Sequence, residues 1–249
     1  MVVLKNSREI IEMSEACRIS AAALKIAAQH MQPGVSTKEI DQAIYREITS
    51  YGAKPSFLGL YGFPASACIS INNQVIHGIP SSKVHLKDGD IVSVDVGAFY
   101  NGYHGDNAFT YEVGNVSEEA KQLLTVTNEC LYKAIEQAKP GNRIGDISYA
   151  VESHARAFGY GVVKTYVGHG VGRELHEDPE VPNYGVKGRG MRLVKGMTLA
   201  IEPMINLIGD NVKSLSDGWT VETVSGSLSA HFEHTIVITD EGARILTKA

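Results

Sequence analysis

The chain has 249 residues, of which 43% are hydrophobic and 20% charged, and its formal net charge at pH 7 is -5. A chain of this length can bury one large core or two small ones. The acidic balance argues against a nucleic-acid-binding protein, which would carry a basic face. The first ten residues, MVVLKNSREI, contain charges and no long apolar run, so we expect no signal peptide, and no apolar run approaches the length of a membrane span.

The three cysteines, Cys17, Cys68 and Cys130, are odd in number and far apart in the sequence, and no CxxC motif occurs. A disulfide framework would need an even, clustered set. Reduced thiols in a cytoplasmic protein are therefore the simplest interpretation.

Two helices are predicted at the start of the chain. The first runs from Asn6 to about residue 31, where Asn6 can serve as N-cap and Glu9 as its capping-box partner. The stretch QPGVSTKE then forms a turn and a second capping box, Ser36 with Glu39. The second helix carries isoleucines at helical spacing and ends near Gly52.

Strands are predicted next, followed by a second group of helices and strands. Residues 66–76 are typical of a strand pair around Asn72-Asn73. The remaining predicted elements are strands at 91–97 and about 103–112, helices at 117–138 and about 145–158, and strands around 161–166, 197–207 and 219–238.

This order of elements repeats with a constant offset of 107 positions, since Pro33-Gly34 recurs as Pro140-Gly141 and LKDGDIVSVD (86–95) aligns with LVKGMTLAIE (193–202). Chance and shared turn chemistry could explain either match alone. Two separated matches at one offset favour a duplication. The sequence therefore predicts two α/β halves, about 1–112 and 113–249, related by a pseudo-twofold axis within one compact domain, 1–249.

Acidic residues interrupt two apolar strands at equivalent positions. Asp95 lies inside VSVDV, and the offset places it on Glu202 in TLAIEPMI. Two buried carboxylates that face each other repel unless a proton or a cation lies between them. Further candidate ligands exist: Asp106 ends NGYHGD, His169 lies between glycines in VGHGVG, and Glu233 lies in HFEHT. The set predicts two divalent ions bridged by shared carboxylates.

Each of these residues also has an ordinary structural explanation. Asp95 could be a salt-bridged strand acid, Glu202 could end a strand before a proline, and Glu233 could face solvent. A lone His169 would more often be a hydrogen-bonded core residue than a ligand. The pair of interruptions related by the repeat, however, is not typical of a solvated face.

Five segments, VSVDVGAFYNGYHGD, NNQVIHGIP, GHGVGRELHEDPEVPNYG, GMTLAIEPMI and HFEHT, resemble those of the type I methionine aminopeptidases. The resemblance covers nearly the whole chain, and the spacings of 11 between the two Asp and 31 between the two Glu fit it. It implies a duplicated pita-bread (creatinase/aminopeptidase-like) α/β fold, with an antiparallel curved sheet flanked by helices. The zinc-binding N-terminal extension of longer type I forms and the large insertion of type II forms are absent from the sequence.

The resemblance also implies roles for the candidate ligands. Asp106 and Glu233 would bridge two metal ions, Asp95 would chelate one of them, and His169 with Glu202 would hold the other. The implied reaction removes the initiator methionine from nascent polypeptides whose second residue is small. A metal-bridging water or hydroxide would attack the scissile carbonyl, with Glu202 as general base.

Two further histidines would act on the peptide by the same resemblance. His176, in ELHEDP, would contact the peptide oxygen and stabilise the tetrahedral intermediate. His77, in VIHGIP, would help to position the peptide beyond the cleaved bond. The ordinary alternative for each is a surface imidazole, but the neighbouring Gly and Pro residues favour rigid loops at the rim of a site.

The methionine side chain would need a tight apolar pocket, and the candidates by resemblance are Phe63, Cys68, Leu175 and Trp219, with Tyr61 near the rim. Trp219 could equally be a buried edge or a surface anchor, because it lies among polar residues in SDGWTVE. Leu60 and Leu175 stand where aromatic residues often occur in the family, and Glu174 precedes Leu175. The shape of the pocket therefore stays open at this stage.

The resemblance finally implies cofactors and partners. Two divalent ions (Mn, Fe, Co or Zn) are expected, and a monovalent cation could lie near Asn72 and Ser229. A carboxylate-rich set with one imidazole does not select among these divalent metals. A cytoplasmic monomer with a transient ribosome contact, and with no DNA or membrane partner, is expected.

Three other functions are compatible with parts of the pattern. A prolidase or Xaa-Pro aminopeptidase shares the fold and ligands, but it usually carries an extra N-terminal domain for which 249 residues leave no room. A non-catalytic binding module of this fold would typically have lost metal ligands. A two-metal phosphoesterase would want more histidines and basic residues, and only Arg173 lies close to a ligand motif.

Overall fold

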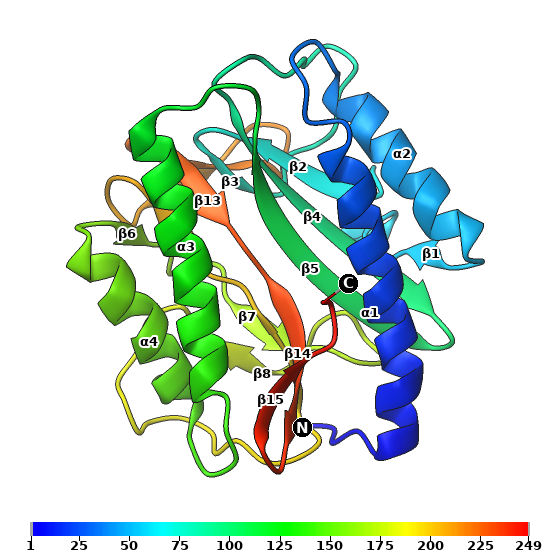
Figure 1. Cartoon of the computed structure of the whole chain (residues 1–249), viewed down its shortest axis with the longest axis vertical. Coiled ribbons are helices and arrows are strands. Elements are labelled where there is room, and N and C mark those ends of the chain that lie inside the picture. The colour runs from blue at the N-terminus through cyan, green and yellow to red at the C-terminus, as the bar shows by residue number, and fades with distance from the viewer. Residues whose placement is uncertain (1, 249) are drawn as a thin grey trace.

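The computed structural model describes residues 2–248 as two helix pairs on either side of a set of curved antiparallel strands (Figure 1). One pair consists of α1 (Ser7–Ala28) and α2 (Thr37–Ser50). The other pair consists of α3 (Glu118–Gln137) and α4 (Ile144–Ala157). No helix within residues 2–248 is long and apolar enough to cross a lipid bilayer.

The first sheet is built around the ten-residue strand β4 (Ile91–Tyr100). Strands β1 (Lys54–Pro55) and β2 (Ala67–Ile71) pair with different parts of β4, and β5 (Tyr103–Glu112) pairs with its whole length. A short 3-10 helix, η1 (Leu60–Gly62), lies between β1 and β2. The β4–β5 connection is two residues long, and both Asn101 and Gly102 have positive φ, as a tight hairpin requires.

The remaining strands form three further sheets, and their pairing is antiparallel. A five-stranded sheet has the order β15 (Gly242–Ile245), β14 (His234–Thr239), β9 (Thr198–Ile201), β7 (Gly168–Gly170) and β8 (Glu177–Val181). A three-stranded sheet contains β13 (Ser229–His231), β10 (Met204–Asn206) and β6 (Gly161–Val162). The last sheet contains β11 (Val212–Ser214), β12 (Val221–Thr223) and β3 (Gln74–Ile76).

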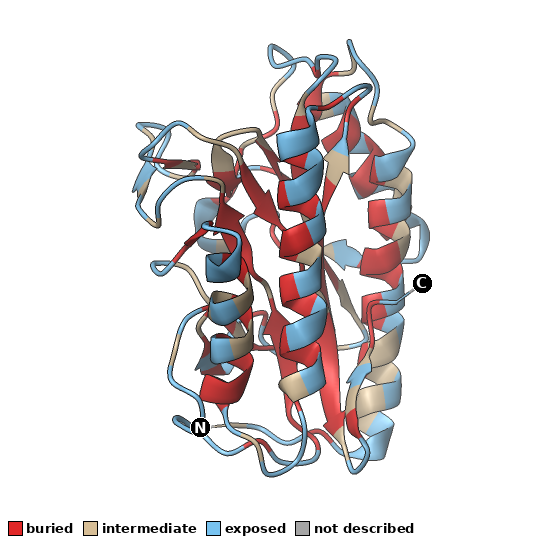
Figure 2. Cartoon of the chain, turned by 60° about the vertical axis from the view of Figure 1, so that its left-hand side comes forward, coloured by how far each residue is buried: buried red, intermediate tan, exposed pale blue. Residues whose placement is uncertain are grey.

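The helices bury one face each against the strands, as the red inner and blue outer surfaces in Figure 2 show. In α2, Ile40, Ile44 and Ile48 are fully buried and pack in one cluster with Val92, Val94 and Val96 of β4. A second cluster joins α3 and α4 to β9, β10 and β14. Burial of apolar area at about 25 cal/mol per Å² makes these two helix–sheet interfaces the main source of stability.

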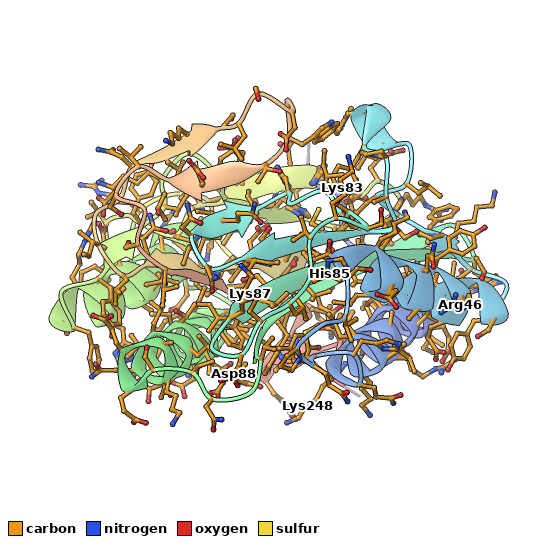
Figure 3. All side chains as sticks on the ribbon, turned by 90° about the horizontal axis from the view of Figure 1, so that it is seen from above. Arg46, Lys83, His85, Lys87, Asp88 and Lys248 are labelled. Atoms are coloured by element: carbon orange, nitrogen blue, oxygen red, sulfur yellow. The ribbon has the colours of Figure 1, made fainter. Side chains whose placement is uncertain are left out.

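The duplication is visible in equivalent local contacts. Helices α2 and α4 have 14 residues each and are displaced by the offset found in the sequence. The Gly34 N–H donates to Leu86 O at 2.8 Å, and the equivalent Gly141 N–H donates to Leu193 O at 3.0 Å. Isolated bridges join Ser36 to His85 and Arg143 to Arg192 at the same offset. His85 is labelled in Figure 3, which views the molecule from above.

The predicted helices and both capping boxes are confirmed, but several strands differ from the prediction. The predicted pair at 66–76 exists as β2 and β3 around a turn, yet the two strands belong to different sheets, and β3 joins β12 from the other half. The segment 197–207 is divided at Glu202-Pro203, because proline cannot donate a ladder hydrogen bond. The segment 219–238 contains three short strands, and 161–166 contains only β6.

Candidate metal centre

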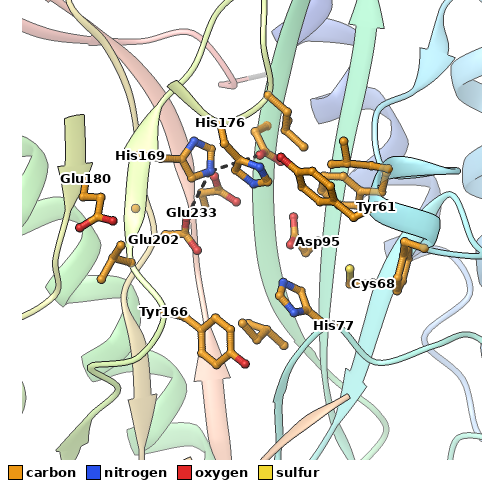
Figure 4. Close-up of a pocket in the computed structure, with 18 of the residues that line it drawn as sticks. Tyr61, Cys68, His77, Asp95, Tyr166, His169, His176, Glu180, Glu202 and Glu233 are labelled. Carbon is orange, nitrogen blue, oxygen red and sulfur yellow. Dashed lines mark ion pairs between the residues drawn. The ribbon is translucent and has the colours of Figure 1, made fainter. Parts of the chain in front are cut away.

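The predicted site residues gather around one cavity of about 540 Å³ that is lined by both halves (Figure 4). The predicted residues that line it are Tyr61, Phe63, Cys68, His77, Asp95, Asp106, His169, Leu175, His176, Glu202, Trp219 and Glu233. Leu60 also lies in the wall. Residues that are far apart in the sequence therefore meet at one cavity, as the duplication predicts.

Asp95 and Asp106 are brought together by the β4–β5 hairpin. Asp95 lies opposite Ala108, and Gly97 lies opposite Asp106. Side chains of residues two apart on a strand share a face, so the two acids are diagonal neighbours on one face of the ladder. Asp106 is only 4% exposed, and Asp95 is half-buried.

Glu233 reaches this face from the other half. Its backbone N–H donates to Ala108 O at 2.9 Å, which ties the β13–β14 junction to β5. Thr235 strengthens the same tie, because its Oγ1 donates to Asp106 O at 2.7 Å and accepts from the Asp106 N–H at 3.2 Å. Ligand atoms of Asp106, Glu233 and His169 consequently lie within 4.8 Å of one another.

His169 is oriented by its own neighbourhood. Its Nδ1 donates to the Gly170 carbonyl at 2.9 Å, which fixes the tautomer and leaves the Nε2 lone pair free. Nε2 lies 3.5 Å from Glu202 Oε1 and 3.8 Å from Asp106 Oδ2. Burial lowers the pKa of His169 to about 4, so the ring is neutral at pH 7, the form that binds metals.

The four carboxyl groups are in an environment that disfavours their charge. Burial raises the pKa of Asp95 to about 7 and that of Glu202 to about 8. For Asp106 and Glu233, burial and then repulsion by the neighbouring carboxylates raise the pKa well above the usual range. Bound cations would reverse both effects, since opposite charge favours the ionised form.

Unpaired oxygens supply a second test of fit to a metal. Asp95 Oδ1, Asp106 Oδ1 and Glu233 Oε1 are buried and make no hydrogen bond within residues 2–248. Such orphaned acceptors are costly unless a ligand satisfies them. The donor set, four carboxylates and a neutral imidazole with a free lone pair, fits hard or borderline divalent ions.

His176 and His77 stand on two sides of the cavity. The His176 ring packs edge-on against His169 at 4.5 Å between centroids and stacks under Tyr61 at 6.3 Å. His77 meets Tyr166 at 5.6 Å and Trp219 at 6.4 Å, in both cases edge-on. Burial lowers the pKa of both histidines, to about 4 for His77. His77 is half-buried and His176 is exposed, and both line the cavity, so their roles in binding the peptide stay a prediction.

An apolar slot adjoins the acids. Phe63, Cys68 and Leu175 are at most 5% exposed and pack in one cluster with partly buried Trp219, whose ring meets Phe63 edge-on at 5.1 Å. Trp219 therefore forms part of the wall and is not a surface anchor. Tyr61, by contrast, is 80% exposed at the mouth.

Sequence reasoning missed Phe57, which belongs to the same apolar cluster and lines the cavity. It approaches because Gly97 has no side chain: a Cβ there would lie 2.8 Å from Phe57 Cε1 and 2.6 Å from Ser56 Cβ. A glycine inside the acid-bearing strand was the available signal, since such glycines mark close approach of another segment.

The two residues named for a monovalent cation lie next to each other. The Ser229 N–H donates to Asn72 O at 2.9 Å, and Asn72 has a φ of 56°. Neither residue lines the cavity described above. Their roles stay a prediction.

The chain belongs to metallopeptidase family M24, whose family model matches residues 11–240. It is 53% identical over 248 residues to methionine aminopeptidase 1 of Bacillus subtilis (strain 168), with 100% of both chains covered. The solved structure of a methionine aminopeptidase from Thermotoga maritima superposes with a TM-score of 0.99 at 47% identity, again over 100% of both chains. The resemblance and the pita-bread fold predicted from the sequence are thereby confirmed.

A prolidase from Pyrococcus furiosus is also similar, with a TM-score of 0.81 and 27% identity, but this chain covers only 66% of it. The full-length match to methionine aminopeptidases at higher identity favours them over the prolidase alternative.

Proposed function

We propose that this chain is a dinuclear metalloaminopeptidase that removes the initiator methionine from polypeptides whose second residue is small. The observation that carries the proposal is a buried cluster of four carboxyl groups and one imidazole that opens onto an apolar slot. We treat residues 1–249 as a single catalytic unit, because each half contributes residues to the cavity.

The proposed ligand assignment is the one implied by the family resemblance, and the positions of the side chains support it. Asp106 and Glu233, which lie together where β5 meets the β13–β14 junction, would hold both divalent ions. Asp95 completes the site on the β4 side, and His169 with Glu202 completes the other. The ions, when bound, supply Lewis acidity toward the scissile carbonyl and lower the pKa of a water molecule.

Glu202 is the group placed to move the proton. Its carboxylate lines the cavity beside His169, where it would accept a proton from the attacking water and pass it to the leaving amine. His176, in edge-on contact with His169, donates a hydrogen bond to the oxygen of the tetrahedral intermediate. His77, on the opposite side against Trp219 and Tyr166, orients the peptide beyond the cleaved bond.

Selectivity follows from the slot and its rim. A flexible thioether suits the apolar slot of Phe57, Phe63, Cys68, Leu175 and Trp219. The next side chain would be placed near His77 and His176, where a large residue collides and displaces the carbonyl. A displacement of about 1 Å can cost on the order of 10²-fold in rate, so small second residues are preferred.

The cofactor and cellular setting are part of the same proposal. A carboxylate-rich site with one imidazole suits Mn, Fe or Co at least as well as Zn. A monovalent cation would lie near Asn72 and Ser229, whose backbones are in contact. Because the substrate is the N-terminal methionine of a new chain, we propose that the enzyme works in the cytoplasm and contacts the ribosome transiently. The same proposal takes the enzyme to be a monomer.

The test is hydrolysis of Met-Ala-Ser by protein that has been stripped of metal and then reloaded with Co²⁺ or Mn²⁺. We expect no cleavage without metal, restoration at two ions per chain, and kcat/KM at least about 10²-fold lower for Met-Lys-Ser and Leu-Ala-Ser. Equal rates on the two methionine peptides would contradict the rim argument. Cleavage of Ala-Pro in preference to Met-Ala-Ser would establish the prolidase alternative instead.

A further inference from the structure

One imidazole beside the metal centre has no part in the proposed chemistry. His231, the last residue of β13, is 1% exposed. Neither of its ring nitrogens makes a hydrogen bond within residues 2–248. A buried polar group that is left without a partner costs about 1–3 kcal/mol, so this side chain calls for an explanation.

The backbone of His231 is fixed from the other half of the molecule. Thr110 of β5 donates through Oγ1 to His231 O at 2.7 Å, and the same Oγ1 accepts from the His231 N–H at 3.0 Å. His231 also lies opposite Met204 in the β10–β13 ladder. The main chain of His231 is therefore fixed on both sides, and its ring is buried.

Two acids of the candidate metal site act on the ring, Glu202 as its ion-pair partner and Asp95 through an electrostatic interaction. His231 Nε2 lies 3.6 Å from Glu202 Oε2, while His169 Nε2 lies 3.5 Å from the other oxygen, Oε1. The Glu202 carboxylate is thus between two imidazoles, one at each oxygen. Of these two rings, His169 is among the residues that line the cavity and His231 is not.

Glu202 needs such a support because of its position in the chain. It follows the end of β9, precedes Pro203, and is outside any strand. Its carbonyl oxygen accepts from Asn183 Nδ2 at 3.0 Å, which fixes the main chain but not the carboxylate. Small changes in the side-chain torsions would turn the carboxylate away from His169.

We propose that His231 is a positioning residue for Glu202: a shift of a few tenths of an ångström from the present 3.6 Å would let Nε2–H donate to Oε2 and keep Oε1 directed toward His169 and the ion that the two residues would share. The role of Glu202 as ligand and base rests on the proposed function, but its orientation can be measured by metal binding alone. Partners that orient metal ligands typically contribute about 10–100-fold to metal affinity or activity.

The experiment compares three replacements of the same ring. In His231→Gln the amide nitrogen reaches the place of Nε2 and can donate, whereas His231→Met has similar length and volume but cannot donate. In His231→Asn the amide reaches only the place of Nδ1. His154→Gln, at a histidine of α4 that bonds to Glu129 of α3, serves as the control for a distant substitution.

The readouts are Co²⁺ titration of metal-stripped protein by calorimetry, the visible spectrum of the Co²⁺ protein, and kcat and KM on Met-Ala-Ser. We expect His231→Met and His231→Asn to weaken binding of one of the two ions about 10–100-fold, to change the spectrum, and to lower kcat by a similar factor with KM unchanged. His231→Gln should stay within a few-fold of the wild type in all three measurements.

Equal impairment of the Gln and Met variants would overturn the hydrogen-bond assignment, because packing alone would then explain the effect. Unchanged Co²⁺ affinity and spectrum in folded His231→Met would overturn the positioning role. If the Met variant does not fold, the Gln and Asn variants are compared instead, and equal impairment of these two would overturn the hydrogen-bond assignment. A wild-type protein that binds two Co²⁺ but leaves Met-Ala-Ser uncut would refute the proposed function, while the titrations would still decide the role of His231.

Discussion

The two halves of the molecule share a scaffold but differ at the strand that carries their equivalent acids. In the first half, β4 runs uninterrupted through ten residues with Asp95 in its middle. In the second half, the equivalent segment is divided into β9 and β10, and Glu202 lies in the break. The helices and bridges around these strands keep a constant offset, so the difference is local.

Because of this difference, the position of Asp95 is fixed by a strand ladder, whereas the side chain of Glu202 can adjust. Asp95 is held in a ladder between Cys68 of β2 and Ala108 of β5. Glu202 is followed by a proline, which ends the ladder, so its side chain can reach between two imidazoles. A duplicated scaffold can thus supply a rigid metal ligand in one half and a proton-transferring group in the other.

The largest expected effect comes from replacing the carboxylate by an amide at Asp95 and Glu202, the two equivalent acids. Glu202→Gln should lower kcat about 10³-fold even at saturating Co²⁺, because it removes general-base catalysis worth 10²–10⁴-fold. Asp95→Asn should mainly weaken metal binding, so excess Co²⁺ should recover much of kcat. The measurement is kcat across a Co²⁺ titration for both variants. Recovery of wild-type kcat by Glu202→Gln at high Co²⁺ would show that the two acids have the same role.

A smaller effect is expected at the equivalent helix starts. Ser36 caps α2, with its Oγ accepting from the Glu39 N–H, while the Glu39 carboxylate accepts from the Ser36 N–H at 2.7 Å. At the equivalent position of α4, Arg143 has no hydroxyl to offer, and only the Asp146 half of the exchange exists.

Ser36→Ala should therefore lower the free energy of unfolding by about 1 kcal/mol, the usual cost of a lost N-cap. Arg143→Ala should cost less through capping, and its effect should come from the lost bond between Nη1 and Gly190 O at 2.7 Å. Urea denaturation of both variants measures the difference. If Arg143→Ala lowered the free energy of unfolding more than Ser36→Ala does, the N-cap would not be what distinguishes the two helices.

The smallest effect concerns the helix ends. Arg156, near the end of α4, makes two bonds to Asp210 at 2.6 and 2.7 Å, whereas the equivalent Thr49 of α2 bonds only within its own helix. The bonds from Arg156 lower the pKa of Asp210 in the folded state well below its ordinary value of 3.8. The stabilisation is consequently present above that value and is lost as the pH falls toward the folded pKa.

Asp210→Asn should cost about 0.5 kcal/mol at pH 7, a value discounted for the partial exposure of both side chains. The difference from wild type should shrink as the pH falls below about 4, because the Asp210 carboxyl of the unfolded chain then takes up a proton while that of the folded protein stays ionised. Thermal unfolding of both proteins between pH 3 and pH 7 measures this difference in stability. A gap that stays constant over this range would show that the ion pair is not its source.

Much of the fold and the set of candidate ligands could be predicted because their signals are local or periodic. The capping residues Asn6 and Ser36 and the isoleucines of α2 define helices from neighbouring residues alone. Asp95 and Glu202 stand out because each interrupts an apolar run, and the repeat relates them. Short strands such as β7 and β11 carry too few residues to show a pattern.

Local and periodic signals are enough to predict the helices, the duplication and the identity of the acids that gather. Three features depend on long-range packing: the pairing of β3 with β12 of the other half, the approach of Phe57 to the slot beside Gly97, and the burial of His231 against Glu202. The physical reason is that a strand's periodicity specifies which of its faces is buried but not which distant strand covers that face. Pairings between residues more than a hundred positions apart, such as Thr110 with His231, form only when both halves have closed around the same core.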